Sequence, residues 1–323
     1  MSSSEFSVID EFFTRNFSQG LSPALGIGDD CAVLDVPKGK QLAVSTDTLL
    51  EGVHFLPNSD PQLLGHKVLA VNLSDLAAVG ATPVWASLAI TLPVIDKVWL
   101  SKFSQGFFEL AEKYALQLVG GDTTCGPLSI TVTIMGLLPQ GMRLTRAGAR
   151  PGDSIYVSNT VGNAGLGLEK AKAACTDIVD EALVAYLSPN PRIELGCKLL
   201  GLASSCIDIS DGLSADLNHI LKASGVGATV SHESLPLTQA VRKHMAQDAD
   251  WLWPYSTGDD YELCFTVPLD VNLDGLKGEL GESITKIGVI EEEKGLRIQT
   301  KDGEQIILNK GYDHFNDKWN AYI

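Results

Sequence analysis

The sequence predicts an α/β protein with two domains, and three observations support this fold class. The chain has 323 residues, more than the roughly 250 to 300 at which a single hydrophobic core stops growing. Hydrophobic residues make up 45% of the sequence, which is enough to form a core in each domain. In both halves, short apolar runs alternate with segments of helical apolar spacing. We therefore expect two α/β domains without a low-complexity linker.

The first half is predicted to interleave strands and helices. Apolar residues recur near helical spacing over residues 5–17. Asp60 followed by Pro61 is typical of a helix N-cap and first helical position, and Gly80 is typical of the end of that helix. A further helix is expected over residues 95–114. Strands are expected over residues 31–36, 41–47, 84–92, 116–119 and 128–138, with a hairpin turn over residues 37–39.

The second half repeats this alternation after a cluster of turn residues, Pro151, Gly152 and Asp153. We place the domain boundary just before this turn, which gives an N-terminal domain of residues 1–148 and a C-terminal domain of residues 149–323. The expected helices span residues 165–174, 191–202 and 213–223. The expected strands span residues 154–157, 228–232, 262–267, 284–290 and 296–299.

The charge balance excludes several classes of partner. The chain has 24 basic and 40 acidic residues, a formal net charge of −16. Such a surface repels phosphate backbones and anionic lipid, so we expect no nucleic acid and no membrane partner. The N-terminus lacks the positively charged segment typical of a signal peptide, and a cytoplasmic location is expected. The six cysteines form no CxxC pair, which favours reduced thiols over a disulfide or zinc framework.

One local pattern recurs along the chain: a short turn that carries aspartate, in most cases beside serine or threonine. The sequence Gly120-Gly121 before Asp122 would let the backbone approach a ligand closely. We expect these turns to converge on one cation site. For any single turn, a helix cap or a solvated loop is the alternative, and capping is the expected role of Thr123 and Thr124. The pattern occurs over residues 26–30, 45–48, 72–75, 120–124, 208–212 and 258–260.

The ligand types in these turns favour magnesium. Carboxylates, hydroxyls and carbonyl oxygens are the ligands that Mg²⁺ prefers, and the six histidines show no i, i+4 pair that would favour zinc. Two like charges about 4 Å apart repel by about 4 kcal/mol at an effective dielectric constant of 20. A cluster of carboxylates therefore stays ionised only around a metal. The expected ligands are Asp30, Asp47, Asp75, Asp122 and Asp208.

Motifs of other nucleotide-binding architectures are absent from the sequence. It contains no GxxxxGK[ST], no GxGxxG after an expected strand and no HRD and DFG pair, which excludes P-loop and protein-kinase architectures. The glycine-rich segment of residues 162–167 is compatible with an anion-binding nest before a helix. Close helix packing is the alternative that we favour there.

Seven motifs occur in the order found in the thiamine-monophosphate kinase family, and the sequence resembles this family over nearly its whole length. The family belongs to the PurM-like superfamily, which includes aminoimidazole ribonucleotide synthetase. At residues 257–260 this chain reads Thr-Gly-Asp-Asp, where the family usually has Gly-Gly-Glu-Asp. The motifs are Gly26-Ile-Gly-Asp-Asp30, Ser45-Thr-Asp-Thr48, Asn72-Leu-Ser-Asp-Leu-Ala-Ala-Val-Gly-Ala81, Gly120-Gly-Asp-Thr-Thr124, Arg146-Ala-Gly-Ala-Arg-Pro-Gly-Asp153, Asp208-Ile-Ser-Asp-Gly212 and Asp260-Tyr-Glu-Leu263.

The resemblance implies transfer of the γ-phosphate of ATP to thiamine monophosphate, with several Mg²⁺ ions per site and K⁺ as a candidate monovalent cation. It also implies a PurM-like fold, in which N-terminal domains that bind ATP and metal pair their sheets across a homodimer. No residue is implied as a nucleophile. The implied metal ligands are Asp30, Thr46, Asp47, Asp75, Asp122, Asp208 and Asp211. The implied ATP-binding residues are Gly121, Asp122, Arg146 and Ser210, and the substrate-binding residues are His54, Asp259 and Tyr312.

Two other classes of function also fit the acidic turns. A magnesium-dependent phosphohydrolase, or another PurM-like ATP-dependent enzyme, would use the same ligands with a different acceptor. An acidic protein that only binds divalent cations would consume no nucleotide. The pair Gly120-Gly121 and the basic residue Arg146 argue against this last class, because a simple cation buffer needs neither.

Overall fold

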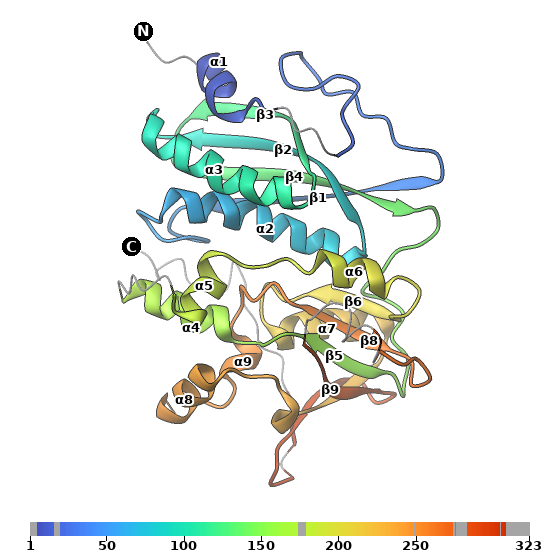
Figure 1. Cartoon of the computed structure of the whole chain (residues 1–323). Coiled ribbons are helices and arrows are strands. Elements are labelled where there is room, and N and C mark those ends of the chain that lie inside the picture. Colours follow the sequence, from blue (N-terminus) through green and yellow to red (C-terminus); the bar gives the residue numbers. More distant parts are fainter. Residues whose placement is uncertain are drawn as a thin grey trace. The chain divides into compact units, whose positions relative to one another are not determined.

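The computed structural model describes residues 5–15, 20–173, 179–248, 250–273, 275, 283–303 and 305–307. The chain divides into two compact units (Figure 1). Unit 1 holds most of the described residues up to Gly141, and unit 2 holds Ala77–Gly80 together with the described residues from Met142 to Ile307. The expected division between residues 148 and 149 stays a prediction, since residues 142–148 are grouped with unit 2 here.

Unit 1 is built on a four-stranded sheet in the order β1-β4-β2-β3. Its strands are β1 (Lys40–Leu50), β2 (Thr82–Leu92), β3 (Gln117–Cys125) and β4 (Ser129–Pro139). The pair β2 and β3 is parallel, and the other pairs are antiparallel. In β4 every second residue is buried, among them Ile130, Val132 and Ile134. This alternation is typical of a sheet with one covered face.

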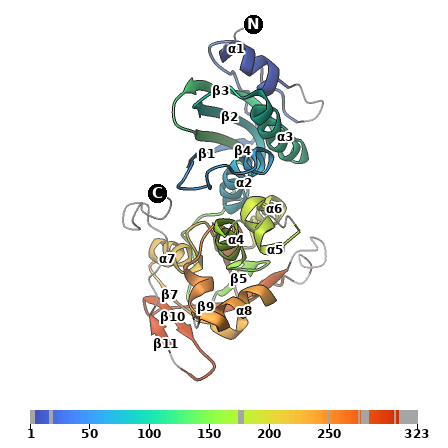
Figure 2. The ribbon, with the colours of Figure 1, turned by 90° about the vertical axis from the view of Figure 1, so that its left-hand side faces the viewer.

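Two helices, α2 (Pro61–Val79) and α3 (Lys97–Lys113), cover one face of this sheet (Figure 2). Each begins after an aspartate cap, whose carboxylate accepts hydrogen bonds from backbone N–H groups of the first helical turn. Asp60 accepts hydrogen bonds of 2.9 and 3.1 Å from two backbone N–H groups, and Asp96 accepts two of 2.8 and 3.1 Å. Gly80, with φ of 77°, ends α2. The predictions of both helices and of Asp60 as a cap are confirmed.

The N-terminal helix is shorter than predicted. It consists of α1 (Glu5–Val8) and the π-helix η1 (Ile9–Phe13), and the backbone is extended at Thr14. Two of its aromatic side chains, Phe12 and Phe13, are buried. Phe17 lies outside the described residues.

The predicted strand over residues 31–36 is wrong. This segment has a single bridge, between Leu25 and Val33, and no hairpin with β1. The strand β1 pairs instead with β4 along its whole length, from Lys40 opposite Pro139 to Leu50 opposite Ser129. Residues 20–36 are instead anchored by Trp85, whose Nε1 donates to the carbonyl of Leu21 at 2.8 Å.

Unit 2 is built on a seven-stranded mixed sheet in the order β11-β10-β7-β9-β5-β8-β6. Buried apolar side chains, including Ile155, Leu217 and Tyr255, form its core. The strands are β5 (Ser154–Ser158), β6 (Ser205–Asp208), β7 (Gly227–Ser231), β8 (Leu263–Val267), β9 (Ile284–Glu291), β10 (Gly295–Gln299) and β11 (Gln305–Ile307). The helices are α4 (Asn163–Lys172), α5 (Glu181–Leu187), α6 (Ile193–Leu199), η2 (His232–Ser234), α7 (Leu213–Ser224), α8 (Gln239–Asp248) and α9 (Trp253–Ser256).

All helices and strands expected in the second half are present, with ends shifted by a few residues. The sequence did not predict β6, β11, α5, α8 or α9. Several of these are very short, and α8 buries only Val241, so their apolar patterns are weak. No helix in the described parts of the chain is long and apolar enough to cross a membrane.

Replacing Trp85 with phenylalanine tests the anchoring of residues 20–36. Trp85→Phe is expected to lower the free energy of unfolding by about 1–3 kcal/mol, because the carbonyl of Leu21 loses its donor. Urea unfolding measures this change, with Trp251→Phe in unit 2 as the control. Limited proteolysis within residues 20–36 should also become faster. Unchanged stability and unchanged cleavage would contradict the anchoring role.

Candidate active site

Asp47 on β1 and Asp75 on α2 lie together where the strand packs against the helix. The hydroxyl of Ser45 donates to Oδ2 of Asp75 at 2.5 Å, and the backbone N–H of Asp47 donates to Oδ1 of Asn72 at 3.2 Å. Burial, repulsion from Asp75 and a hydrogen bond with it raise the pKa of Asp47 to about 6. Unit 1 therefore brings together two of the predicted metal ligands.

Three of the six predicted turns are not turns. Residues 45–48 lie within β1, residues 72–75 lie within α2, and residues 120–124 lie within β3. Regular pairing explains this result, because β1 and β3 continue their ladders through these residues. The expectation that Thr123 and Thr124 cap a helix is therefore wrong. The acidic side chains stand on rigid elements rather than on flexible loops.

The backbone of Gly121 on β3 packs closely against the neighbouring strand β2. Its φ is 154°, and a Cβ atom at this position would lie 1.8 Å from the carbonyl oxygen of Leu88. Glycine is therefore required for the contact between β2 and β3. At Gly120 the corresponding position has no atom within 4 Å beyond its chain neighbours. The open approach expected for this pair of glycines thus exists at Gly120, whereas Gly121 is explained by strand packing.

The strand register places two predicted ligands on the sheet face away from α2. Side chains alternate between faces along a strand, so Thr46 points away from the face that carries Asp47. Its hydroxyl is 2.9 Å from that of a threonine on β4. The register aligns Asp122 with Ala89, and Ala89 with Thr131, which belongs to the same face as Thr46. Asp122 and Asp47 therefore occupy opposite faces of the sheet.

The remaining predicted positions of unit 1 lie near the surface. Asp30 is exposed, and its backbone N–H donates to the side chain of Asp29 at 2.9 Å. His54 follows β1 in a tight turn, where its Nδ1 accepts a hydrogen bond of 3.0 Å from the backbone of Leu50. This bond leaves Nε2 as the nitrogen that carries the proton.

In unit 2, Asp216 organises the loop that carries Ser210 and Asp211. Its Oδ2 accepts hydrogen bonds of 3.1 Å from the backbone N–H groups of Ser210, Asp211 and Gly212. Burial raises the pKa of Asp216 to about 8, and repulsion from Asp208 and Asp211 adds to this effect. Asp216 was not among the residues predicted from the sequence. Its position in the first turn of α7, just after the motif, is the signal that marks it.

The loop that carries Asp259 is hydrogen-bonded through its backbone to the loop that carries Ser210. The backbone N–H of Asp259 donates to the carbonyl of Ser210, and that of Tyr261 donates to Ile209, both at 2.8 Å. The hydroxyl of Tyr261 also donates to Oδ1 of Asp259 at 3.0 Å. Asp259, Tyr261 and the nearby Asn159 have left-handed backbones, with φ of 67°, 48° and 48°. Such strain costs about 1–3 kcal/mol per residue and is typical of functional loops.

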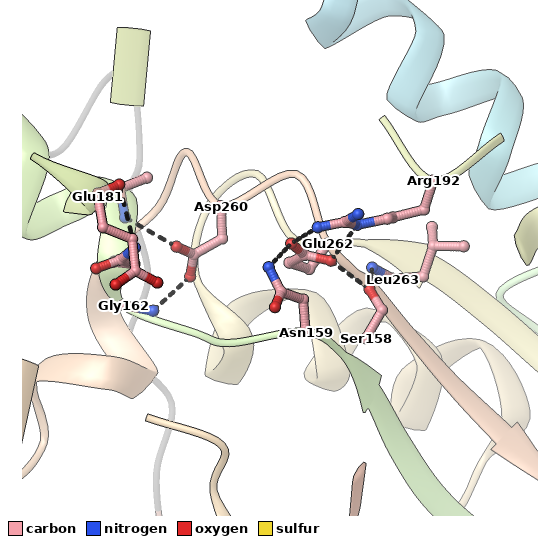
Figure 3. Close-up of polar contacts among 10 residues, drawn as sticks. Ser158, Asn159, Gly162, Glu181, Arg192, Asp260, Glu262 and Leu263 are labelled. Carbon is pink, nitrogen blue, oxygen red and sulfur yellow. Dashed lines mark hydrogen bonds and ion pairs between the residues drawn. The ribbon is translucent and has the colours of Figure 1, made fainter. Parts of the chain in front are cut away.

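A buried ion pair fixes the end of this second loop (Figure 3). The guanidinium of Arg192 donates to Glu262 through Nε at 2.7 Å and through Nη2 at 2.6 Å. The hydroxyl of Ser158 and the amide of Asn159 donate to the same carboxylate, at 2.5 and 3.1 Å. Ser158 in turn accepts the backbone N–H of Leu263 at 2.9 Å. No signal in the sequence points to Arg192 as the partner of Glu262.

The glycine-rich segment of residues 162–167 receives an anion from the chain itself (Figure 3). The carboxylate of Asp260 accepts the backbone N–H groups of Gly162 and Ala164, at 2.6 and 3.1 Å, at the start of α4. The start of the segment therefore forms an anion-binding nest that the chain's own Asp260 fills, and its later glycines show the close helix packing that we favoured. A Cβ atom on Gly167 would lie 2.0 Å from the carbonyl oxygen of Ala182.

The structure brings the predicted residues together in two groups, one in each unit. Unit 1 joins Asp47 with Asp75, and unit 2 joins Ser210, Asp211 and Asp259 through backbone contacts and Asp216. Arg146 is exposed. Among the described residues, no three His, Cys, Asp or Glu side chains lie close enough to hold a metal. A single cluster of all the carboxylates stays a prediction, and Tyr312 lies outside the described residues.

Comparison with known proteins matches each half of the chain to a domain of the same protein family. The chain matches the models "AIR synthase related protein, N-terminal domain" over residues 28–138 and "AIR synthase related protein, C-terminal domain" over residues 150–301. It is 48% identical to thiamine-monophosphate kinase of Escherichia coli strain K12, and the match covers 98% of this chain and 99% of that protein. The chain belongs to the thiamine-monophosphate kinase family.

Solved structures of this family share the fold. Thiamine-monophosphate kinase from Stenotrophomonas maltophilia K279a is 41% identical with a TM-score of 0.81, over 88% of this chain and 92% of that one. The structure described as "AaThiL complexed with AMPPCP and TMP" is 30% identical with a TM-score of 0.76, over 96% of this chain and 97% of that one. The PurM-like, mixed two-domain fold predicted from the sequence is thereby confirmed.

Removing Glu262 is expected to destabilise unit 2 strongly. Glu262→Ala leaves the buried guanidinium of Arg192 without its carboxylate, which costs about 3–5 kcal/mol in the free energy of unfolding. Glu11→Ala is the matched control, because its ion pair with Lys97 is exposed and worth about 1 kcal/mol or less. Urea unfolding measures both. Equal effects of the two substitutions would show that the Glu262 pair does not fix the loop.

Asp260 is expected to make stability depend on pH. Burial raises the pKa of Asp260 from 3.8 to about 7. Between these values the folded chain keeps a proton that the unfolded chain has released. Asp260 therefore contributes a free energy of unfolding that decreases as the pH rises from about 4 to about 7. The difference between wild type and Asp260→Asn, measured by urea unfolding across this range, should show this slope, and a flat difference would contradict it.

Proposed function

We propose that this chain transfers the γ-phosphoryl group of ATP to thiamine monophosphate and forms thiamine diphosphate. The observation that carries the proposal is 48% identity, over nearly the full length of both chains, to a thiamine-monophosphate kinase. The acidic motifs of both units support it, because donor and acceptor are anions that an acidic protein binds only through cations.

The carboxylates described above fit Mg²⁺. Magnesium is usually held by one or two carboxylates, with water and substrate phosphates completing its coordination. Asp47 and Asp75 supply such a pair in unit 1, and Asp208 and Asp211 supply carboxylates in unit 2. Bound Mg²⁺ supplies the positive charge that neutralises the transferring phosphoryl group and aligns the two phosphates. Asp30, Thr46 and Asp122 are the further proposed ligands, and K⁺ is a proposed monovalent cation.

The chain's own residues position the reactants. Gly121, Asp122, Arg146 and Ser210 are proposed to bind ATP, and His54, Asp259 and Tyr312 to bind the thiamine substrate. The loops that carry Ser210 and Asp259 are hydrogen-bonded to each other, which supports a fixed distance between nucleotide and acceptor. Fixed placement of two reactants supplies much of the rate in such a reaction.

No protein nucleophile is needed for this transfer. The acceptor is a phosphate oxygen that is already deprotonated at neutral pH, so a strong general base is also unnecessary. We propose direct in-line transfer from ATP to the acceptor. Isolation of a phosphorylated residue during turnover would contradict this mechanism.

The proposed assembly is a cytoplasmic homodimer that pairs through the sheet face of unit 1 opposite α2 and α3. This face carries exposed apolar side chains on β1, including Leu42 and Val44, which are 39% and 57% exposed. Exposed apolar residues of this kind are typical of an interface with another sheet. Sedimentation of the wild type and of Val44→Glu tests the assembly, and a monomeric wild type would contradict it.

The release of ADP distinguishes the proposed kinase from its rivals. ADP release from ATP and Mg²⁺ should depend on thiamine monophosphate. Steady release without this acceptor would identify a phosphohydrolase. Metal binding without any nucleotide consumption would identify a cation-binding protein instead.

Neutralising a proposed magnesium ligand is expected to lower turnover without loss of stability. Asp75→Asn removes a charge from a partly buried, like-charged pair, so the free energy of unfolding should stay equal or rise. The value of kcat should fall by about 100-fold or more, because preorganised charge stabilisation is lost. Asp122→Asn should lower kcat in the same way, and it should leave the free energy of unfolding unchanged because its side chain is exposed.

Asp35→Asn, an exposed residue of unit 1, is the control for these two variants. Steady-state kinetics and urea unfolding provide both readouts. Wild-type turnover in Asp75→Asn or Asp122→Asn would remove that residue from the magnesium site.

A further inference from the structure

We propose that Ser224, the last residue of α7, is a positioning residue that holds Arg146 in place for the nucleotide, an inference that rests on the proposed function. Arg146 belongs to the 142–149 segment, which contains no helix or strand and is part of unit 2. The side chain of Arg146 is exposed, and it has no ion-pair partner among the described residues. In a chain with a formal net charge of −16, such a guanidinium suits the phosphate groups of a nucleotide.

The hydroxyl of Ser224 is committed to this segment. It accepts the backbone N–H groups of Gly148 and Ala149, at 3.1 and 3.2 Å, and it donates to the carbonyl oxygen of Arg146 at 3.3 Å. A hydroxyl group has one donor and two acceptor sites, so the capacity of this one is filled. A serine in a helix can also bond back to a carbonyl of its own helix. The side chain of Ser224 therefore serves the 142–149 segment rather than α7.

Two further contacts restrict the segment. The backbone N–H of Cys206, on the edge strand β6, donates to the carbonyl of Thr145 at 2.9 Å. Gly148 has a φ of 126°, and a Cβ atom there would lie 2.3 Å from the carbonyl oxygen of Ser204. Arg146 thus lies in the chain between a residue anchored to β6 and residues anchored to α7. Its backbone is fixed, which limits where its guanidinium can reach.

The helix α7 also holds the second proposed nucleotide-binding residue of unit 2, Ser210. Asp216, in the first turn of α7, accepts the backbone N–H of Ser210 at 3.1 Å. Asp216 and Ser224 are eight positions apart (216 to 224), which corresponds to about 12 Å along a helix axis. The helix itself is fixed, because Leu217 and Ile220 are buried in the core of unit 2. It therefore sets the spacing of two nucleotide-binding residues before the nucleotide arrives, which lowers the cost of binding.

Binding of AMPPCP, an ATP analogue that is not hydrolysed, tests this role without turnover. In calorimetric titration of the full chain with Mg²⁺, Ser224→Ala should weaken binding by about tenfold, because the segment that carries Arg146 loses its anchor. Ser224→Thr keeps the hydroxyl and should retain most of the affinity. Ser104→Ala is the matched control, since its hydroxyl also donates to a backbone carbonyl, at 3.1 Å, but in α3 of unit 1. It should match the wild type.

A double-mutant cycle tests whether Ser224 acts through Arg146. Arg146→Ala should weaken AMPPCP binding more than Ser224→Ala does, and the double variant should bind no more weakly than Arg146→Ala alone. In steady-state kinetics, Ser224→Ala should raise the KM for ATP with little change in the KM for thiamine monophosphate. Fully additive effects of the two substitutions on AMPPCP binding would overturn the proposal.

Gly148→Ala disturbs the same segment and leaves the hydroxyl of Ser224 in place. The added Cβ atom collides with the carbonyl oxygen of Ser204, so the segment must shift. AMPPCP binding should weaken by a factor similar to that of Ser224→Ala. Because Gly148 is exposed, this variant remains a valid test if Ser224→Ala loses stability, which urea unfolding measures.

The outcomes separate this inference from the proposed function. Wild-type affinity for AMPPCP in both Ser224→Ala and Gly148→Ala, in a protein that phosphorylates thiamine monophosphate, would overturn the positioning role and leave the kinase standing. Weaker binding in both variants, in a protein that does not phosphorylate thiamine monophosphate, would support the positioning role and overturn the kinase. No AMPPCP binding by the folded wild type would overturn the positioning role.

Discussion

The contact between Asp47 and Asp75 is the constraint on which the organisation of unit 1 depends. Two like-charged groups meet at a partly buried junction between β1 and α2, and burial together with this repulsion raises the pKa of Asp47. The surrounding structure fixes the contact, because Ser45 binds Asp75 and Asn72 binds the backbone of Asp47. An arrangement that costs stability is explained by the cation and phosphates that it is proposed to bind.

In unit 2, too, the surrounding structure fixes the residues that are proposed to bind metal and substrate. Its proposed ligands lie on two loops, and hydrogen bonds to the carboxylates of Asp216 and Glu262 hold those loops in place. The carboxylate of Asp260 is bound at the start of α4, so the loop is fixed on both sides of Tyr261. Precise transfer between two anionic reactants requires such rigid supports, because a misplacement of about 1 Å lowers the rate strongly.

The sequence predicted most elements of both sheets, because their apolar periodicity is strong and their helix caps are explicit, as at Asp60. It could not show that aspartates beside serine or threonine stand in strands and a helix, since the same residue types also favour turns. The role of Gly121 depended on the neighbouring strand, which local sequence does not reveal. The partnership of Arg192 with Glu262 joins positions 70 residues apart, and only the fold brings them together.

Phosphorus NMR of the reaction follows donor, acceptor and products at once, and so tests whether the phosphoryl group passes from ATP to thiamine monophosphate. The wild type is mixed with ATP, thiamine monophosphate and Mg²⁺, and the spectrum is followed over time. We expect equal amounts of ADP and thiamine diphosphate, with no orthophosphate and no reaction when Mg²⁺ is removed. Orthophosphate as the product, or thiamine diphosphate formed equally well without a divalent cation, would contradict it.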